Sequence, residues 1–318
     1  GRVDFGNDTS NPFDSGYGYA NAALGIYTTY TQSAAYLVPD WIYNNVEWYV
    51  QDNWKASDRL TLDLGVRFYW IEPQYDKLEL TANFLPDQFD PAKAPRLYYP
   101  DVVNGTRVGR DQVTGATVQA AYIGRVIPNS GAALNGLFPA GQGIDKHLYK
   151  NRGIHYSPRF GFAFDLSGDQ RRVLRGGTGM FYNRERGDTV YQLVTNPPRS
   201  TQVSLNYGLL QDITPGANTL IAPPALSAFN YDGPIPTTIP WNVGVQMVLP
   251  WASTLDVSYV GSYAYNQTQL RNINAPAYGA AFLAANQDPT IGRGCTGCPA
   301  ASAIPGANSL SVDFLRPY

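Results

Sequence analysis

The chain has 318 residues and a formal net charge of -2, with 44% hydrophobic and 15% charged residues. Its 23 Lys and Arg against 25 Asp and Glu leave no basic excess, and no basic run is present, which argues against nucleic-acid binding. The longest segment without a charge, Ser15–Pro39, is too rich in Tyr, Thr, Gln and Asn to cross a membrane as a helix.

Neither end of the sequence has the features of a complete chain. Residues 1–13 lack the basic start and apolar core of a signal peptide, and the sequence stops at FLRPY, where a proline occupies the place of a closing strand. We therefore expect the sequence to be part of a longer protein.

The first predicted hairpin joins Tyr43–Lys55 to Leu60–Ile71 through the polar turn Ala56–Arg59. In its second strand every other residue is apolar, and Asp63 and Arg67 fall between the apolar residues. A helix would place these two charges beside leucines on one face, so the alternation predicts a β-strand.

Two further hairpins repeat this pattern. In residues 157–184, phenylalanines alternate with polar or small residues before the turn Ser167–Arg171, and a second alternating strand follows. In residues 237–263, the turn Pro250–Ser253 joins two more alternating strands. Each hairpin therefore has one apolar and one polar face, as in a soluble sheet with a core or in a membrane barrel with a lumen.

The segments between the hairpins favour the barrel. Glu72–Asn151 and Glu185–Pro236 are rich in Gly, Pro, Asn and Asp, and they far exceed the loops of about 4–6 residues found in compact domains. Short turns at one end and long loops at the other are typical of an outer-membrane barrel, whereas a sandwich or propeller has more even loops. The sequence thus predicts an all-β fold, an antiparallel transmembrane β-barrel. The two long loops should lie outside the cell, and Asp58, Asp169 and Ala252 in the periplasm.

Polar strand residues should line the lumen of this barrel. The predicted lumen-facing residues are Glu47, Gln51, Asp63, Arg67, Arg159, Asp165, Arg175, Gln246 and Asp256. Trp54 and Trp251 should form the periplasmic aromatic girdle, and Trp70 and Trp241 the outer one. About ten residues between the girdles, at about 3.3 Å each and a tilt of about 40°, span roughly 25 Å, the height of the apolar band. An alternative is that these tryptophans cap an ordinary core.

Several segments resemble the barrel of TonB-dependent outer-membrane receptors: YVQDNWKASDRLTLDLGVRF, SPRFGFAFDLSGDQRRVLRGGTGMFYNR, and LDVSYVGS followed by RNIN. The similarity is to the Oar-like group, which has an N-terminal carboxypeptidase-regulatory-like domain and is common in Acidobacteria. YANAALG, Tyr19–Gly25, resembles the segment before the Val-Gln-Asp strand of that group.

The resemblance implies a barrel of about 22 strands, filled by a plug, that takes up a scarce ligand with energy relayed by TonB. Residues 1–318 contain no segment that we identify as a plug, a TonB contact, a regulatory-like domain or a closing strand. We therefore expect them to form a partial outer-membrane barrel domain, whose contact with the TonB complex belongs to other parts of the parent protein.

Catalytic patterns are weak. His147 and His155 stand in no known nucleophile motif, and we expect them to be satisfied or solvated loop histidines. The segment Arg175–Gly179 lacks the spacing of a phosphate loop, so its glycines are interpreted as strand residues that relieve crowding. We expect no enzymatic activity and no cofactor.

Cys295 and Cys298 form the one cysteine pair. Zinc would require two more nitrogen or sulfur ligands nearby, and a thioredoxin-type site would require a βαβ setting. In an oxidising exterior a loop disulfide is favoured over free thiols or a metal.

The predicted function is that of a barrel segment of a TonB-dependent transporter in the bacterial cell outer membrane, in contact with outer-membrane lipid. A passive porin or a surface-adhesin barrel is the alternative. A secreted all-β carbohydrate-active protein would need paired carboxylates in one cleft, whereas Asp63, Asp165 and Asp256 recur on separate hairpins. The sequence does not identify the ligand, which could be a metal chelate, another small ligand, a glycan or a peptide, because long loops and plug apices that vary freely recognise it in such receptors.

Overall fold

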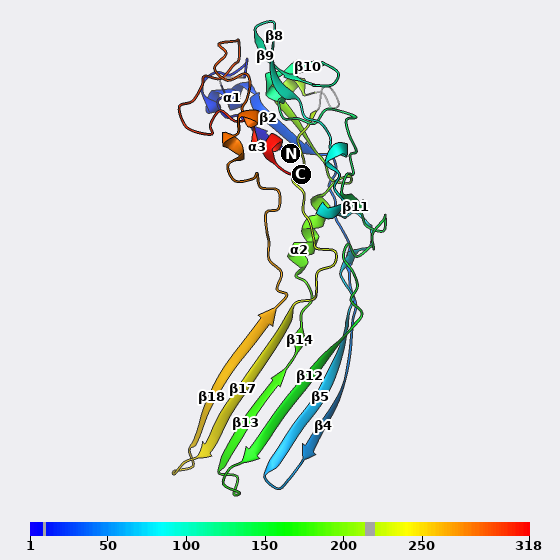
Figure 1. Cartoon of the computed structure of the whole chain (residues 1–318), viewed down its shortest axis with the longest axis vertical. Helices are drawn as coiled ribbons and strands as arrows, with labels where there is room; N and C mark the ends of the chain where they lie inside the picture. Colours follow the sequence, from blue (N-terminus) through cyan, green and yellow to red (C-terminus); the bar gives the residue numbers. More distant parts are fainter. Residues whose placement is uncertain (9–10, 214–219) are drawn as a thin grey trace.

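The computed structural model describes residues 1–8, 11–213 and 220–318, which form a wall of long strands and a folded body beyond its upper end (Figure 1). The wall strands follow one another in chain order and pair antiparallel, and β14 continues β13 along β17. They are β4 (Asn45–Lys55), β5 (Leu60–Ile71), β12 (Ile154–Asp165), β13 (Arg172–Gly179), β14 (Phe181–Tyr182), β17 (Thr237–Val248) and β18 (Thr254–Tyr265). Within the described residues the sheet is open, with β4 and β18 as its edges.

The three predicted hairpins are present, and their short turns lie together at the lower end of the wall (Figure 1). The turn between β17 and β18 places Trp251 and Ala252 at left-handed φ angles of 60° and 56°. Two consecutive residues with positive φ match the right-handed twist of the flanking strands, which is why such turns close hairpins.

The segments outside the wall carry their own secondary structure. One sheet has the order β1-β2-β15-β16, a second the order β10-β9-β8, and two strand pairs complete the set. The strands are β1 (Arg2–Asp4), β2 (Ile26–Ser33), β3 (Trp41–Ile42), β6 (Tyr75–Asp76), β7 (Ala82–Phe84), β8 (Tyr99–Val103), β9 (Thr106–Arg110), β10 (Thr117–Gln119), β11 (Leu137–Pro139), β15 (Gln202–Leu209) and β16 (Leu220–Ile221). The short α-helices are α1 (Gly18–Leu24), α2 (Gly187–Tyr191) and α3 (Val312–Leu315). The 3-10 helices are Pro86–Gln88, Pro91–Lys93, Ala120–Tyr122, Gln192–Thr195, Leu210–Asp212, Ala280–Phe282 and Ala284–Asn286.

These segments, which include the two predicted long loops, pack into one outer body with secondary structure of its own. A buried cluster joins the first long loop to the second through Ala140, Leu148, Val190, Leu193 and Phe229. The N-terminal strand β2 pairs with β15 of the second loop, which ties the start of the chain into the same body. Both loops contribute apolar side chains to one core, and no local periodicity in either sequence reveals this. Residues 214–219 of the second loop lie outside the described residues.

No helix among the described residues is both long enough and apolar enough to cross a membrane.

Candidate functional site

The nine polar residues predicted to line a lumen all lie on one face of the wall. Side chains alternate along a strand, and residues paired across a ladder point to the same side. The register joins Gln51 to Gly65 and Gly65 to Arg159, and it joins Gln246 to Asp256 in the last hairpin. The pairs across all strands of the wall place the nine residues on one side, which we call the polar face: Glu47, Gln51, Asp63, Arg67, Arg159, Asp165, Arg175, Gln246 and Asp256. The opposite side, with Leu64 and Phe160, is the apolar face.

Charged residues of the polar face pair with one another near the edge strand β4. Arg67 Nε donates to Glu47 Oε2 at 2.9 Å, and its guanidinium lies 5.3 Å from the centre of the Tyr69 ring. The Asn53 amide donates to the Asp63 carboxylate. The Arg67 and Glu47 side chains are 36% and 28% exposed, so this pair contributes at most about 1 kcal/mol to stability.

Arg159 differs because no carboxylate among the described residues contacts it. Its Nη2 donates to the Tyr69 hydroxyl at 3.2 Å, and its guanidinium lies 4.7 Å from the centre of the Phe181 ring. Gly65 and Gly179 are its partners on either side, so no side chain flanks it in the ladder. Its Nε is buried without a hydrogen bond in the described structure, which leaves the guanidinium incompletely satisfied.

Asp165 lies on the polar face by register, but its carboxylate closes the turn of the second hairpin. It is 8% exposed and accepts hydrogen bonds from the backbone N–H groups of Ser167, Gly168 and Gln170 at 3.2, 2.9 and 2.9 Å. The structure therefore assigns Asp165 to the turn rather than to an open polar surface. Strand alternation alone cannot reveal this, because it does not record what the turn backbone requires.

Three of the four predicted girdle tryptophans lie on the apolar face. Trp54 pairs with Leu62, Trp70 with Ile154, and Trp241 with Thr178. Trp251 instead lies in the turn between β17 and β18 and is 94% exposed.

Trp241 is not in register with Trp70. It aligns with Leu64 through Thr178 and Phe160, which lies well below Trp70 along the strands. The strands lean, however, so a line of constant register climbs toward the loop end on going from β5 to β17 (Figure 1). Three strand spacings of about 4.8 Å at a tilt of about 40° raise Trp241 by roughly 9 Å along the membrane normal. This offsets most of the difference in height between Leu64 and Trp70, which are six residues apart along β5.

Further aromatic residues, which were not among the predicted girdle residues, lie on the apolar face near its loop end. Trp48 stacks on Phe68 with ring centroids 5.3 Å apart, and Phe68 meets Tyr156 edge-on at 5.5 Å. The sequence already indicates the face of Trp48, because Val46, Trp48 and Val50 are two residues apart along the same strand.

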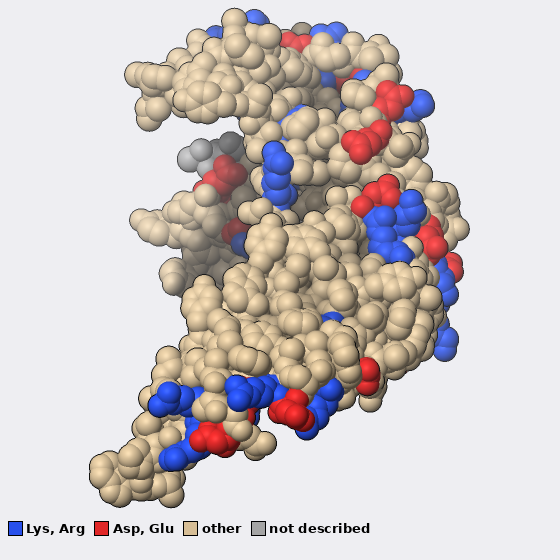
Figure 2. Space-filling model, turned by 60° about the horizontal axis from the view of Figure 1, so that its bottom comes forward, with Lys and Arg blue, Asp and Glu red and all other residues tan. Residues whose placement is uncertain are grey.

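Charged side chains gather at the end of the wall that carries the short turns (Figure 2). Lys55 and Asp58 form an exposed ion pair at this end of the wall, with 3.4 Å between Lys55 Nζ and Asp58 Oδ1. Two charged residues, Asp52 and Arg172, also lie on the apolar face by register, Arg172 at the turn end of β13 and Asp52 opposite Leu64, two residues beyond Trp54. Neither residue was among the predicted lumen or girdle residues.

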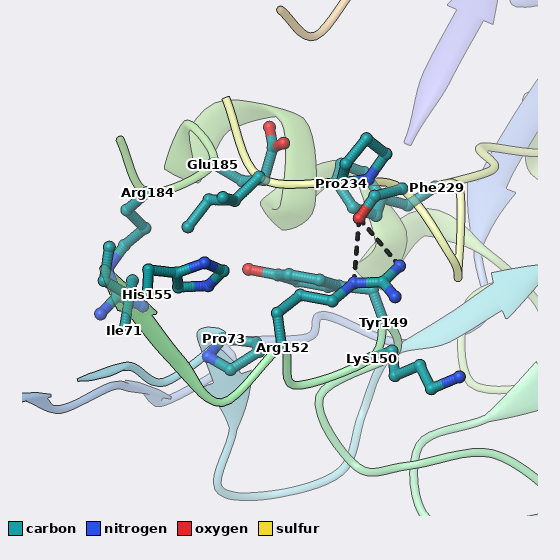
Figure 3. A pocket seen from close by; sticks show the side chains of 12 residues that line it. Ile71, Pro73, Tyr149, Lys150, Arg152, His155, Arg184, Glu185, Phe229 and Pro234 are labelled. Carbon is teal, nitrogen blue, oxygen red and sulfur yellow. Dashed lines mark hydrogen bonds between the residues drawn. The ribbon is translucent and has the colours of Figure 1, made fainter. Parts of the chain in front are cut away.

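A mouth pocket lies where the wall meets the outer body, and it consists of two adjoining hollows that share Arg152, His155, Pro234 and Ile235. In Figure 3 the Tyr149 hydroxyl points toward the His155 ring, and Arg152 extends along the near side. The hollow lined also by Tyr182, Asp232 and Tyr265 is called the outer hollow and has a volume of 280 Å³. The hollow lined also by Ile71, Tyr149 and Arg184 is called the inner hollow.

Hydrogen bonds at the base of the mouth pocket fix its charged residues. Arg184 donates to the Asn44 carbonyl at 3.1 Å and to the Glu72 carbonyl, and burial lowers the pKa of its guanidinium. The Glu185 carboxylate accepts a hydrogen bond from the Thr268 hydroxyl, but burial raises the pKa of the Glu185 carboxyl. Burial also raises the pKa of the Tyr149 phenol well above its ordinary value.

The two histidines have different environments. His147 is 7% exposed, with its Nε2 3.2 Å from Glu72 Oε1 and its Nδ1 against Asp145. Burial would raise the pKa of the Glu72 carboxyl, but hydrogen bonds from Asn44 and His147 outweigh this and lower it. His155 belongs to β12, so the prediction of a loop histidine was wrong for this residue. In the described part of the chain no group of three or more His, Cys, Asp or Glu residues could hold a metal ion.

Cys295 and Cys298 form a disulfide in the outer body. Thr296, one of the two residues between them, donates its N–H to the Gly105 carbonyl, and its carbonyl accepts a hydrogen bond from the Arg107 N–H, each at 2.9 Å. The disulfide loop is therefore attached to the hairpin formed by β8 and β9.

A protein-family model described as an outer membrane beta barrel domain matches residues 1–318. No curated protein and no solved structure matches the chain. The family match spans the whole chain, and the long antiparallel strands agree with it. The chain therefore belongs to the outer membrane beta barrel domain family and resides in the bacterial outer membrane.

Proposed function

We propose that this chain is a barrel segment of a TonB-dependent transporter that takes up a scarce ligand through the outer membrane. The segment YVQDNWKASDRLTLDLGVRF, which resembles the Oar-like receptors, forms the hairpin of β4 and β5. The observation that carries the proposal is the folded outer body, which places the mouth pocket at the loop end of the wall. A preformed, partly apolar pocket is what capture of a dilute ligand requires.

In this proposal the apolar face contacts lipid and the polar face borders the lumen. Arg172, the first residue of β13, is compatible with this, because charged side chains near the membrane interface cost only about 0–1 kcal/mol. Asp52, opposite Leu64 on β4, lies deeper and places an unfavourable charge on this face. The two open edges pair with further strands, since lipid satisfies no backbone hydrogen bond. Contact with the TonB complex is made by other parts of the parent protein.

The lipid-facing assignment is tested with spin labels on neighbouring residues of the full protein, Leu64→Cys and Asp63→Cys. A label at Leu64 should be accessible to oxygen and shielded from a polar nickel reagent, while a label at Asp63 should show the reverse. Cys295 and Cys298 are bonded to each other and do not compete for the label. A label at Leu64 that is shielded from both reagents indicates a packed core, and the barrel orientation then fails.

A passive porin or a surface adhesin with the same wall is the second candidate. A plugged transporter should conduct no ions in a planar bilayer and should bind a purified periplasmic TonB domain. A stable open channel without added denaturant, together with no TonB binding, contradicts the transporter proposal and favours the porin.

A further inference from the structure

The charges of the mouth pocket are not balanced. Among the described residues that line it, the cations Lys150, Arg152 and Arg184 face two carboxylates, Glu185 and Asp232. One positive charge is therefore in excess with His155 neutral. A pocket with excess positive charge favours an anionic ligand.

Arg152 is the cation with free hydrogen-bonding capacity. Its Nε and Nη2 both donate to the Gly233 carbonyl, at 3.2 and 2.9 Å, which fixes the guanidinium. Asp232 lies 3.8 Å from Nη2, but it also accepts from Lys150 Nζ at 3.3 Å, so its charge is shared. Nη1 makes no hydrogen bond to the described residues and is available to a ligand. Arg184, in contrast, uses its donors on carbonyl groups of the pocket base.

Most of the remaining lining is apolar or aromatic, and Thr237 and Asn266 are its uncharged polar residues. The apolar body of a ligand fits in the outer hollow of 280 Å³, against Tyr182, Tyr265, Pro234 and Ile235, because the inner hollow beside Phe229 has a volume of only 30 Å³. A purely ionic ligand such as chloride would leave these surfaces without a contact. A ligand that fits both features carries one anionic group on a small apolar or ring-shaped body.

We propose that the mouth pocket binds a monoanionic carboxylate ligand with an apolar or aromatic body, and that Arg152 binds the carboxylate. A monoanion matches the single excess charge better than a phosphate dianion does. The inference rests on the proposed function in that the pocket serves as the outer binding site of a transporter.

The test uses the full protein in detergent, with binding measured by fluorine NMR for 4-fluorobenzoate, its neutral amide 4-fluorobenzamide, and 4-fluorophenyl phosphate. Benzoate should bind at least about tenfold more tightly than the amide, as expected for one charge-assisted hydrogen bond. Arg152→Gln should remove this preference, and Arg152→Lys should restore part of it. Arg186→Gln, at an exposed arginine outside the pocket lining, should change nothing.

A second variant has the opposite sign and guards against misfolding of the first. Asp232 is an exposed competitor for Arg152, so Asp232→Asn should strengthen benzoate binding several-fold. Equal binding of benzoate and benzamide, no effect of Arg152→Gln, or tighter binding of the phosphate overturns the proposal. If benzoate binding fails the test but the protein conducts no ions and binds the TonB domain, the transporter proposal still holds. If the protein forms an open channel, the transporter proposal is contradicted, but the result for benzoate binding is unchanged.

Discussion

Buried amide side chains hold the irregular outer body together at the level of single residues. Asn83 donates to the carbonyls of Leu148 and Phe229 at 2.9 and 2.8 Å, and its carbonyl oxygen accepts from the Phe229 N–H at 2.8 Å. Asn196 bridges Ala82 and Ser227 in the same way. Loops without a continuous ladder leave such backbone groups unpaired, and burial makes unpaired groups costly.

The first prediction concerns Asn83. Asn83→Ala leaves three buried backbone groups without partners, and we expect it to destabilise the outer body by about 3 kcal/mol. Limited proteolysis of the protein in outer-membrane vesicles should then cut the loops faster, while the wall stays protected. Asn272→Ala, at an exposed asparagine, is the control. Equal cleavage rates for both variants contradict this role of Asn83.

The second prediction concerns acid stability. Asp111 is 1% exposed, and hydrogen bonds from Arg96 and from the Val113 N–H hold the pKa of its carboxyl well below the ordinary range. A depressed folded-state pKa gives stability that is present above the unfolded value of about 3.9 and is lost as the pH falls through the folded value.

Hydrogen exchange of β8–β10 should therefore show lower protection as the pH falls below about 4, after correction for the intrinsic exchange rate. Asp111→Asn should be less stable at neutral pH and should lose less on acidification. A variant with the same acid response as the native protein excludes Asp111 as the source.

At the scale of elements, aromatic rings cover glycines on the apolar face of the wall. A Cβ built on Gly176 would lie 2.7 Å from the Phe162 ring, and one on Gly261 would lie 2.6 Å from the Trp241 indole. The rings thus occupy the space that the missing side chains leave, which packs neighbouring strands without a cavity.

The third prediction tests this packing. Gly176→Ala should force Phe162 off its position and press on the Asn242 carbonyl, which would be 2.9 Å from the new Cβ, so we expect a cost of about 1–3 kcal/mol. Gly65→Ala is the matched strand control, because its nearest atom would be 3.3 Å away. Urea unfolding of the detergent-folded protein measures both variants, and equal midpoints would refute the ring-over-glycine interpretation.

The edges of the sheet dominate the behaviour of the whole molecule. Every residue of β4 is exposed, and most of β18 is exposed too. Unpaired N–H and C=O groups along such strands invite aggregation in water and cannot be satisfied in lipid. A wall of the described strands alone has no way to close, since barrels in the outer membrane have about eight strands or more.

The fourth prediction follows for residues 1–318 expressed alone. We expect them to aggregate or to need detergent, and not to form a closed barrel. Gel migration before and after heating measures this, because a closed barrel resists the detergent until it is heated. Heat-modifiable, protease-resistant migration of the isolated chain would contradict the prediction.

The sequence alone predicted the wall closely. The strand Leu60–Ile71 has the predicted bounds, and the three hairpins occur with their turns at one end. A period of two is a local signal, because each side chain reports its own face from its position in the strand. The role of Asp165 was not predictable in this way, because it depends on backbone groups of the turn that alternation does not describe.

The outer body and the mouth pocket were decided only by the tertiary structure. Asn83 and Phe229 are 146 residues apart in the chain, and Lys150 and Asp232 are 82 apart, yet each pair is in hydrogen-bond contact. Contacts of this kind arise when separate loops fold against one another, and they follow no repeating pattern along the sequence. The sequence therefore determined which residues share each face of the wall through local alternation, whereas the excess charge of the mouth pocket exists only where distant loops meet.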